Sequence, residues 1–260
     1  MKYTKFLAAL LLTGLSILAL TSFRNASKPG KEKDSDAMTN TKGFAVLELF
    51  TSEGCSSCPP ADELMAKIQN EYKEQPVYLL VFHVDYWDRQ GWKDVFSSHD
   101  YTNRQLSYQN WLGINSIYTP QLVVNGKAEF VGSDEFKIRS AINTALNSGY
   151  SAQLSVQSNQ DKNKFTLNYE VSNGPEDSRL LVAIVQKSAS TKVERGENKG
   201  RLLSHVQIVR SLTSVSLSGA HKGTATISLP AAFNAAAWEV IAMVQDVNKG
   251  EIATAARVNL

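Results

Sequence analysis

Cysteine is scarce in this chain, which has two cysteines among 260 residues. Two thiols exclude both a scaffold of several disulfides and a zinc site with four cysteine ligands. The motifs G-x-S-x-G, G-x-x-x-x-G-K-[ST] and G-x-G-x-x-G do not occur. Their absence argues against a serine hydrolase, a phosphate-binding loop and a dinucleotide site. The chemistry that the sequence offers therefore depends largely on Cys55 and Cys58.

An excess of charge of one sign is also lacking. The chain has 27 basic and 25 acidic side chains, a formal net charge of +2. Nucleic-acid binding needs clustered basic residues that neutralise phosphates, and no arginine-rich stripe is present. The hydrophobic content of 43% is too high for a wholly disordered chain. We therefore expect a globular protein without a nucleic-acid partner.

Residues 1–22 are typical of a secretory signal peptide. Lys2 and Lys5 precede an apolar run from Phe6 to Leu20, which is short for a membrane span of about 20 residues. An uncleaved N-terminal anchor is the alternative. Residues 23–42 are polar and predict a flexible linker. We expect an exported protein, periplasmic or extracellular, with no membrane association beyond the signal segment.

Residues 43–149 alternate between strand-like and helix-like patterns. FAVLELF (44–50) and VYLLVFHV (77–84) are apolar runs of strand length. The segment between them has apolar residues at helical spacing after two prolines, so the two strands are expected to be parallel. QLVV, Asn125-Gly126 and KAEFV then predict a β-hairpin, and another amphipathic helix follows it.

The composition changes near Tyr150. From there, short apolar or alternating segments are separated by Gly, Pro, Asn and Asp, and no helix-length amphipathic stretch intervenes. Six or seven strands in this pattern predict a β-sandwich domain over residues 150–260.

The segment Cys55-Ser56-Ser57-Cys58 stands between a predicted buried strand and a predicted helix. Free N–H groups and the positive end of the dipole at a helix N-terminus favour thiolate over thiol. Two intervening residues allow both sulfurs to close a small disulfide ring and to reopen it. We expect Cys55 to be the exposed attacking thiolate and Cys58 to resolve the mixed disulfide.

Four segments resemble a bacterial family of secreted thioredoxin-like proteins that is catalogued as a domain of unknown function. They are ELFTSEGCSSCPPADELM, FHVDYWDRQGWKDVFSS, YTPQLVVNG and RGENKGRLLSHVQIVR, and the similarity spans residues 44–260. The resemblance implies an α/β thioredoxin-like domain at 43–149, followed by an all-β sandwich domain at 150–260. It also implies that Pro120 is cis and lies against the cysteines, with Thr119 presenting its backbone to a partner.

The resemblance further implies a role for Glu48, a charged residue in the first buried strand. In thioredoxins, a buried carboxylate on this strand accepts a proton from the resolving thiol. Burial raises the pKa of a carboxyl group toward the range that is useful for a general base. The alternative is that Glu48 is a carboxylate in a structural hydrogen-bond network.

The segment after the second strand contains candidate substrate-binding residues, because binding loops gather at the carboxyl ends of strands in open α/β sheets. These candidates are Asp85, Trp87, Asp88 and Trp92. The alternative is that the tryptophans pack against the next helix and that the aspartates cap turns. His83, in an apolar strand, is expected to be a core histidine.

A second group of polar residues lies between predicted strands of the later half. It forms either a hydrogen-bonded hairpin or a domain interface that positions the cysteines. Its members are Arg195, Glu197, Asn198, Arg201, His205 and Arg210.

Three functions are compatible with these patterns. The first is thiol–disulfide exchange with protein thiols or disulfides, catalysed by Cys55 and Cys58. The second is copper(I) binding by the same cysteines, with His83 as the natural third ligand. The third is a non-catalytic interaction protein in which the disulfide braces a loop. No cofactor is expected, and no metal site is assigned apart from the copper(I) alternative.

Overall fold

The computed structural model describes residues 43–161, 164–217, 221–230 and 233–259. These residues all belong to one compact unit, Asp34–Leu260. The predicted signal peptide and linker lie outside the described residues. No helix in the described ranges is long and apolar enough to cross a membrane.

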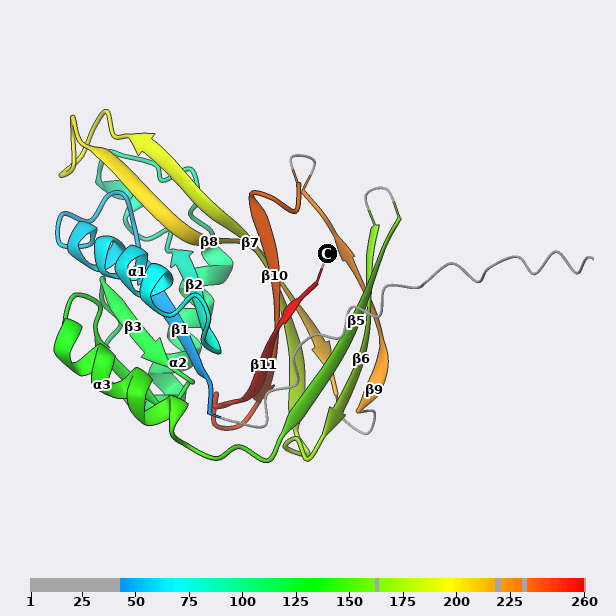
Figure 1. Ribbon diagram of the computed structural model, residues 1–260. Helices are drawn as coiled ribbons and strands as arrows, with labels where there is room; N and C mark the ends of the chain where they lie inside the picture. Colours follow the sequence, from blue (N-terminus) through cyan, green and yellow to red (C-terminus); the bar gives the residue numbers. More distant parts are fainter. Residues whose placement is uncertain (1–42, 162–163, 218–220, 231–232, 260) are drawn as a thin grey trace, which may run out of the picture. The chain divides into compact units, whose positions relative to one another are not determined.

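Strands dominate the described part of the chain (Figure 1). In chain order the elements are β1 (Ala45–Thr51), α1 (Pro59–Glu71), β2 (Val77–His83), η1 (Asp88–Gln90), α2 (His99–Leu112), β3 (Gln121–Val124), β4 (Ala128–Val131), α3 (Glu135–Leu146), β5 (Gln153–Asp161), β6 (Lys164–Ser172), β7 (Ser178–Lys192), β8 (Leu202–Ser216), β9 (Lys222–Ser228), β10 (Trp238–Asp246) and β11 (Ile252–Val258).

An eight-stranded mixed sheet runs through both halves of the chain, in the order β11-β10-β7-β8-β2-β1-β3-β4. The predicted parallel pairing of β1 with β2 is confirmed. β2 also pairs in parallel with β8, where Val81 lies opposite Ile208. A separate three-stranded sheet has the order β5-β6-β9. The expected fold, an α/β thioredoxin-like domain followed by an all-β sandwich domain, is therefore wrong, because four strands of the later half continue the sheet that β1 and β2 begin.

Three hydrophobic cores flank this large sheet. The first contains α1, α3 and one face of β1, with Leu47 and Leu49 packed near Met65. The second lies on the other face of β1, where Val46 and Phe50 share a core with aromatic residues of α2. The third lies between the large sheet and β5-β6-β9, and Figure 1 shows β10 and β11 between the helices and these three strands.

β7 explains why the sandwich prediction failed. Leu180, Val182 and Ile184 face the core shared with β5, β6 and β9. The intervening Leu181 and Ala183 face the core shared with α2. Successive side chains of a strand point to opposite faces, so the segment Leu180–Val185 of β7 is a continuous apolar run because it is buried on both sides. Its sequence pattern carries no information on which element covers each face.

The predicted hairpin at Asn125-Gly126 is confirmed, since β3 and β4 are antiparallel neighbours. Asn125 and Gly126 have positive φ, 50° and 66°, a backbone region that Asn and Gly adopt most readily. A Cβ at Gly126 would lie 2.0 Å from the carbonyl oxygen of Gly250, in the β10–β11 turn. The amide of Ile252 also donates to the carbonyl of Asn125 at 2.9 Å. Two hairpin turns from distant parts of the sequence are thus in direct contact.

Candidate functional site

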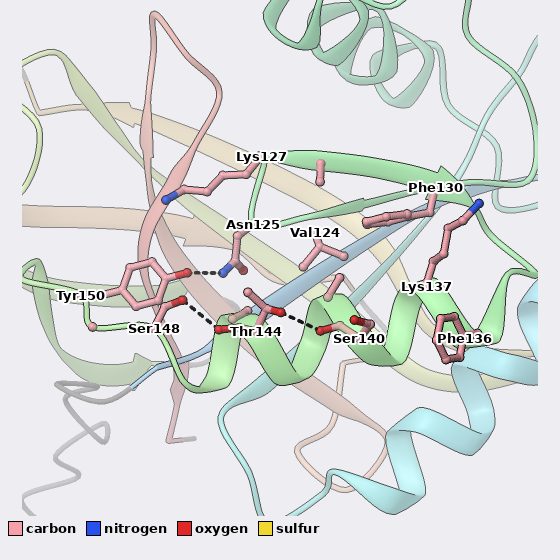
Figure 2. Close-up of a pocket in the computed structure, with 14 residues that line it drawn as sticks. Val124, Asn125, Lys127, Phe130, Phe136, Lys137, Ser140, Thr144, Ser148 and Tyr150 are labelled. Carbon is pink, nitrogen blue, oxygen red and sulfur yellow. Dashed lines mark hydrogen bonds between the residues drawn. The ribbon is translucent and has the colours of Figure 1, made fainter.

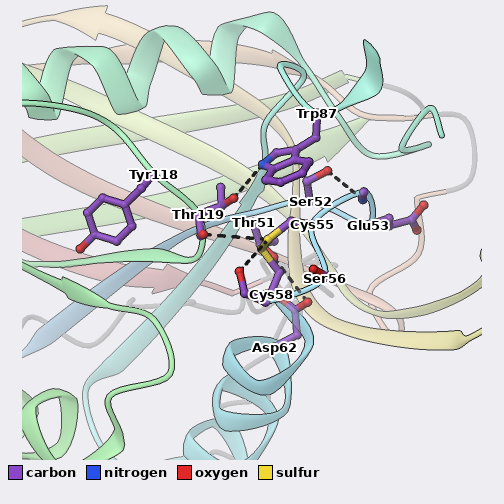
Figure 3. Close-up of a disulfide and its surroundings, with 12 residues drawn as sticks. Thr51, Ser52, Glu53, Cys55, Ser56, Cys58, Asp62, Trp87, Tyr118 and Thr119 are labelled. Carbon is purple, nitrogen blue, oxygen red and sulfur yellow. Dashed lines mark hydrogen bonds between the residues drawn. A yellow bond between two sulfur atoms is a disulfide. The ribbon is translucent and has the colours of Figure 1, made fainter. Parts of the chain in front are cut away.

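Cys55 and Cys58 form a disulfide at the N-terminal end of α1, with their Cα atoms 5.5 Å apart (Figure 3). Cys58 is the N-cap residue, and Pro59 follows in the first turn, where a missing N–H is tolerated. Both cysteines are fully buried, whereas Ser56 and Ser57 between them are exposed. The expectation that Cys55 is exposed is therefore wrong.

The loop before β3 covers one side of the disulfide. Sγ of Cys55 lies 3.9 Å from the carbonyl oxygen of Thr119, and the Thr119–Pro120 peptide bond is cis, as the resemblance implies. The indole Nε1 of Trp87 donates to Oγ1 of Thr119 at 2.7 Å (Figure 3). A Cβ at Gly54 would meet Cβ of Trp87 at 3.2 Å, so Trp87 also packs against the cysteine loop. The structure thus brings Trp87 and Thr119 to the disulfide, and their role in substrate binding stays a prediction.

A loop of the later half also contacts the cysteine segment. The side-chain amide of Asn198 donates to the carbonyl oxygens of Glu53 and Cys55, each at 2.9 Å. The carboxylate of Glu197 accepts a hydrogen bond from the amide of Ser56 at 3.1 Å. Among the alternatives for this polar group, these contacts favour a role in positioning the cysteines.

Two histidines and three carboxyl groups lie buried together beside the cysteine loop. Nε2 of His205 lies 3.4 Å from Oε1 of Glu53, and its Nδ1 lies 3.9 Å from Oδ2 of Asp62. His83 contacts His205 edge to face, and its Nδ1 is 2.7 Å from Oδ2 of Asp94. Five of the buried polar atoms in this group make no hydrogen bond: Glu53 Oε1, Asp62 Oδ1, His83 Nε2, His205 Nδ1 and His205 Nε2. Most buried polar groups are hydrogen-bonded, so this group is unusually under-satisfied.

Asp62 has the most perturbed carboxyl group of this cluster. Burial raises its pKa to about 7, against the attraction of His205 and a hydrogen bond from Thr51. Asp94 behaves in the opposite way, because the charge and hydrogen bond of His83 outweigh burial and lower the pKa of Asp94. Sequence analysis did not single out Asp62, although it lies four residues after Cys58 in α1. Residues at that spacing share one face of a helix, so the spacing was a usable signal.

Glu48 does not lie with the cysteines. Its side chain is on the face of β1 that contacts α2, with Val46 and Phe50, whereas Thr51 lies on the face toward α1. Arg104 donates to both carboxylate oxygens of Glu48, at 2.5 and 2.9 Å, and the hydroxyl of Tyr108 donates a further short hydrogen bond. Glu48 therefore belongs to a structural network, and we withdraw the proton-acceptor role that the resemblance implied for it.

The remaining candidates after β2 have separate roles. Asp85 accepts hydrogen bonds from the Thr102 hydroxyl at 2.6 Å and from His99 at 3.1 Å. Asp88 accepts from the amide of Asp94 and from the hydroxyl of Ser97. Both aspartates therefore hold the loop in shape.

Trp92, in contrast, contacts the cysteine segment. Its indole Nε1 donates to Oε2 of Glu53 at 2.7 Å. Of the four candidates after β2, the two tryptophans contact the site and the two aspartates fold the loop that carries them.

No group of three or more His, Cys, Asp or Glu side chains is arranged to hold a metal ion in the part of the chain that the structure describes. His83, the predicted third ligand for copper(I), is engaged with Asp94 through Nδ1. Copper(I) binding by the reduced cysteines stays a prediction.

Residues 46–245 match the family model described as a protein of unknown function, DUF1223. The chain belongs to this family. It matches no curated protein at significant similarity. A crystal structure of an Agrobacterium tumefaciens protein is similar, with 27% identity and a TM-score of 0.64 over 83% of this chain and 93% of that one. HBP35 of Porphyromonas gingivalis shares the fold at 18% identity and a TM-score of 0.56, over 84% of this chain and 75% of that one.

Proposed function

We propose that this protein is a thiol–disulfide oxidoreductase that acts on protein thiols or disulfides through Cys55 and Cys58. The observation that carries the proposal is a disulfide at the start of α1 beside a buried carboxyl group, Asp62, with a pKa of about 7. Thiol–disulfide exchange moves protons as well as electrons, and a group that titrates near neutral pH is suited to exchange them.

When the protein oxidises a partner dithiol, a thiolate of the partner attacks Sγ of Cys55. A bond between the partner and Cys55 forms, the Cys55–Cys58 bond breaks, and the sulfur of Cys58 leaves with the electron pair. Asp62, one turn further along α1, gives its proton to that sulfur. A second thiolate of the partner then attacks the mixed disulfide, which releases Cys55 as the thiolate and leaves the partner oxidised. The reverse sequence reduces a partner disulfide and restores the Cys55–Cys58 disulfide.

Trapping of mixed disulfides tests this proposal. Cys58→Ser removes the resolving thiol, so partners should stay linked to Cys55 and migrate as adducts on a non-reducing gel. The matched control is Cys55→Ser, which keeps one cysteine at the same site but removes the attacking one. An adduct that forms with Cys58→Ser, is absent from Cys55→Ser and disappears on reduction supports the proposal. Equal labelling of both variants, or no adduct in the native compartment, contradicts it.

A second candidate, a structural disulfide in an interaction protein, is favoured by one observation. Both cysteines are fully buried, and inaccessible cysteines exchange slowly. Equilibration with reducing thiol buffers separates the candidates. A potential below about −300 mV is typical of structural disulfides, whereas known exchanging dithiols lie between about −270 and −120 mV.

We also propose that the protein is exported, on the basis of the signal-like residues 1–22. Exported proteins reach an oxidising environment, where a disulfide persists. Fractionation of cells that produce the full chain tests this, since a chain that stays in the cytoplasmic fraction contradicts export.

A further inference from the structure

The loop that joins β7 to β8, residues 193–201, is here named the β7–β8 tip (Figure 1). Asn198 is its anchor, because its side chain is buried and its Nδ2 donates to the carbonyls of both Glu53 and Cys55. Oδ1 of Asn198 accepts from Nη1 of Arg201 at 2.9 Å, which fixes the orientation of the amide. The tip is thus held on the cysteine loop by a side chain whose polar atoms are all engaged.

Glu197 places a negative charge beside the same loop. Hydrogen bonds from the side chain and backbone of Ser56 lower the pKa of Glu197, so this exposed carboxyl group is ionised at neutral pH. Its Oε2 accepts the amide of Ser56, the residue that follows Cys55. Glu197 therefore accepts a hydrogen bond from an N–H group just ahead of α1, and that N–H group is no longer free to stabilise a thiolate.

This arrangement affects the two redox states differently. The disulfide is uncharged, whereas the dithiol form gains from ionisation of a thiol at the helix N-terminus. A carboxylate beside that thiol opposes the ionisation by like-charge repulsion and by taking up the N–H group. Other ionisable groups around the loop include Glu53, Asp62 and Asp94, with His83 and His205 facing them from β2 and β8. Arg201 adds a positive charge on the tip itself, where it contacts Asn198.

We propose that the β7–β8 tip regulates the disulfide. Asn198 keeps the disulfide covered, and Glu197 favours its oxidised state over the dithiol. The biological use of this regulation rests on the proposed oxidoreductase function. The effect on the redox equilibrium does not, because it is a property of the disulfide in any partner's absence.

Equilibration with glutathione tests the role of Glu197. Two molecules of reduced glutathione convert the Cys55–Cys58 disulfide to two thiols and form one molecule of oxidised glutathione, with both protons passing to the protein sulfurs. Glu197→Gln keeps a hydrogen-bond acceptor and removes the charge. We expect it to shift the equilibrium about two- to fivefold toward the dithiol, which corresponds to a potential about 10–20 mV more oxidising.

Glu194→Gln is the matched control, because Glu194 is an exposed carboxylate on the same tip. It should shift the equilibrium by less than Glu197→Gln does. If the tip merely supports the fold, the two variants and wild type should have equal equilibrium constants with glutathione. That result would overturn the role of Glu197. A shift in Glu197→Gln together with no trapped partner in Cys58→Ser would leave the tip's role standing and reject the proposed function.

The rate of reduction tests the covering role of Asn198. Asn198→Ala removes two hydrogen bonds to the cysteine loop, so dithiothreitol should reduce the disulfide about thirtyfold faster, the factor that corresponds to about 2 kcal/mol. Lys199→Ala, an exposed change on the same tip, should leave the rate unchanged. A wild-type rate in Asn198→Ala would overturn the covering role. If that variant does not fold, the rate in Asn198→Ser, a smaller change at the same position, decides it in the same way.

Discussion

Two buried groups of charged residues lie on opposite faces of β1, and they differ in how well they are satisfied. On the face toward α2, Glu48 receives hydrogen bonds from Arg104 and Tyr108, and Gln245 donates to the Tyr108 hydroxyl at 3.1 Å. On the face toward α1, Asp62 and His205 keep buried polar atoms that make no hydrogen bond.

The contrast distinguishes a structural ionic site from a candidate reactive one. In the Glu48 group each charge has an opposite charge in contact, and breaking such a buried pair is strongly destabilising. In the Asp62 group, burial is incompletely compensated, so the carboxyl pKa moves toward neutrality. Perturbed groups of this second kind cluster at functional sites, and this one lies beside the disulfide.

The largest expected effect comes from breaking the satisfied group. Arg104→Met leaves Glu48 buried without its opposite charge, so the free energy of unfolding should fall by about 3–5 kcal/mol, measured by urea denaturation. The double variant Glu48→Leu/Arg104→Met removes both charges and should recover most of that loss. A double variant as unstable as Arg104→Met would show that packing, not the unpaired charge, causes the effect.

The next effect concerns the pH dependence of stability at Asp62. Its folded-state pKa of about 7 is above the ordinary aspartate pKa of 3.8, so folding favours the protonated form. Stability from this group is therefore complete below about pH 4 and is lost as the pH rises to about 7. At about 1.4 kcal/mol per pKa unit the loss reaches about 4 kcal/mol.

Asp62→Asn should abolish this loss, because the amide stays neutral. The stability difference between Asp62→Asn and wild type should shift in favour of the variant between pH 4 and pH 8, as measured by urea denaturation at each pH. Parallel pH profiles for the two proteins would contradict a raised pKa at Asp62.

The smallest effect comes from a pair of hydroxyl deletions, one in each group. Tyr108→Phe removes a hydroxyl that contacts Glu48, Arg104 and Gln245, and should lower stability by about 1.5–3 kcal/mol, as for hydrogen bonds to charged groups. Thr51→Val removes one 3.4 Å hydrogen bond to Asp62, and we expect a loss of about 0.5 kcal/mol. Equal losses in thermal or urea unfolding would remove the distinction between the two groups.

Local elements of the fold were predictable because their signals are local. Asn125-Gly126 supplies the two positive φ angles of its turn, and Pro59 marks the start of α1. The disulfide was equally predictable from the sequence, because only two residues separate Cys55 and Cys58. Propensity and spacing within a few residues were enough in each of these cases.

The shared sheet and the buried cluster were not predictable in the same way. Nothing near Val81 or Ile208 indicates that β2 and β8 pair, because apolar strands accept many neighbours. Alternation along β1 places Glu48 and Thr51 on opposite faces, but it does not show which face receives α1. The positions of His205 and Asn198 beside the cysteines depend on the β2–β8 pairing, which cannot be predicted from the sequence around them.

The contact between the Gly126 and Gly250 turns has a consequence for the order of folding. The β3–β4 hairpin can form early, because its strands are neighbours in sequence, but its turn fits against a second hairpin that is encoded far downstream. Contacts of such long range slow folding, because much chain must be ordered before they form. During synthesis, the β3–β4 turn therefore lacks its contact with the β10–β11 turn until the C-terminal strands have been made. A chaperone that shields the first half of the chain would be most useful in that interval.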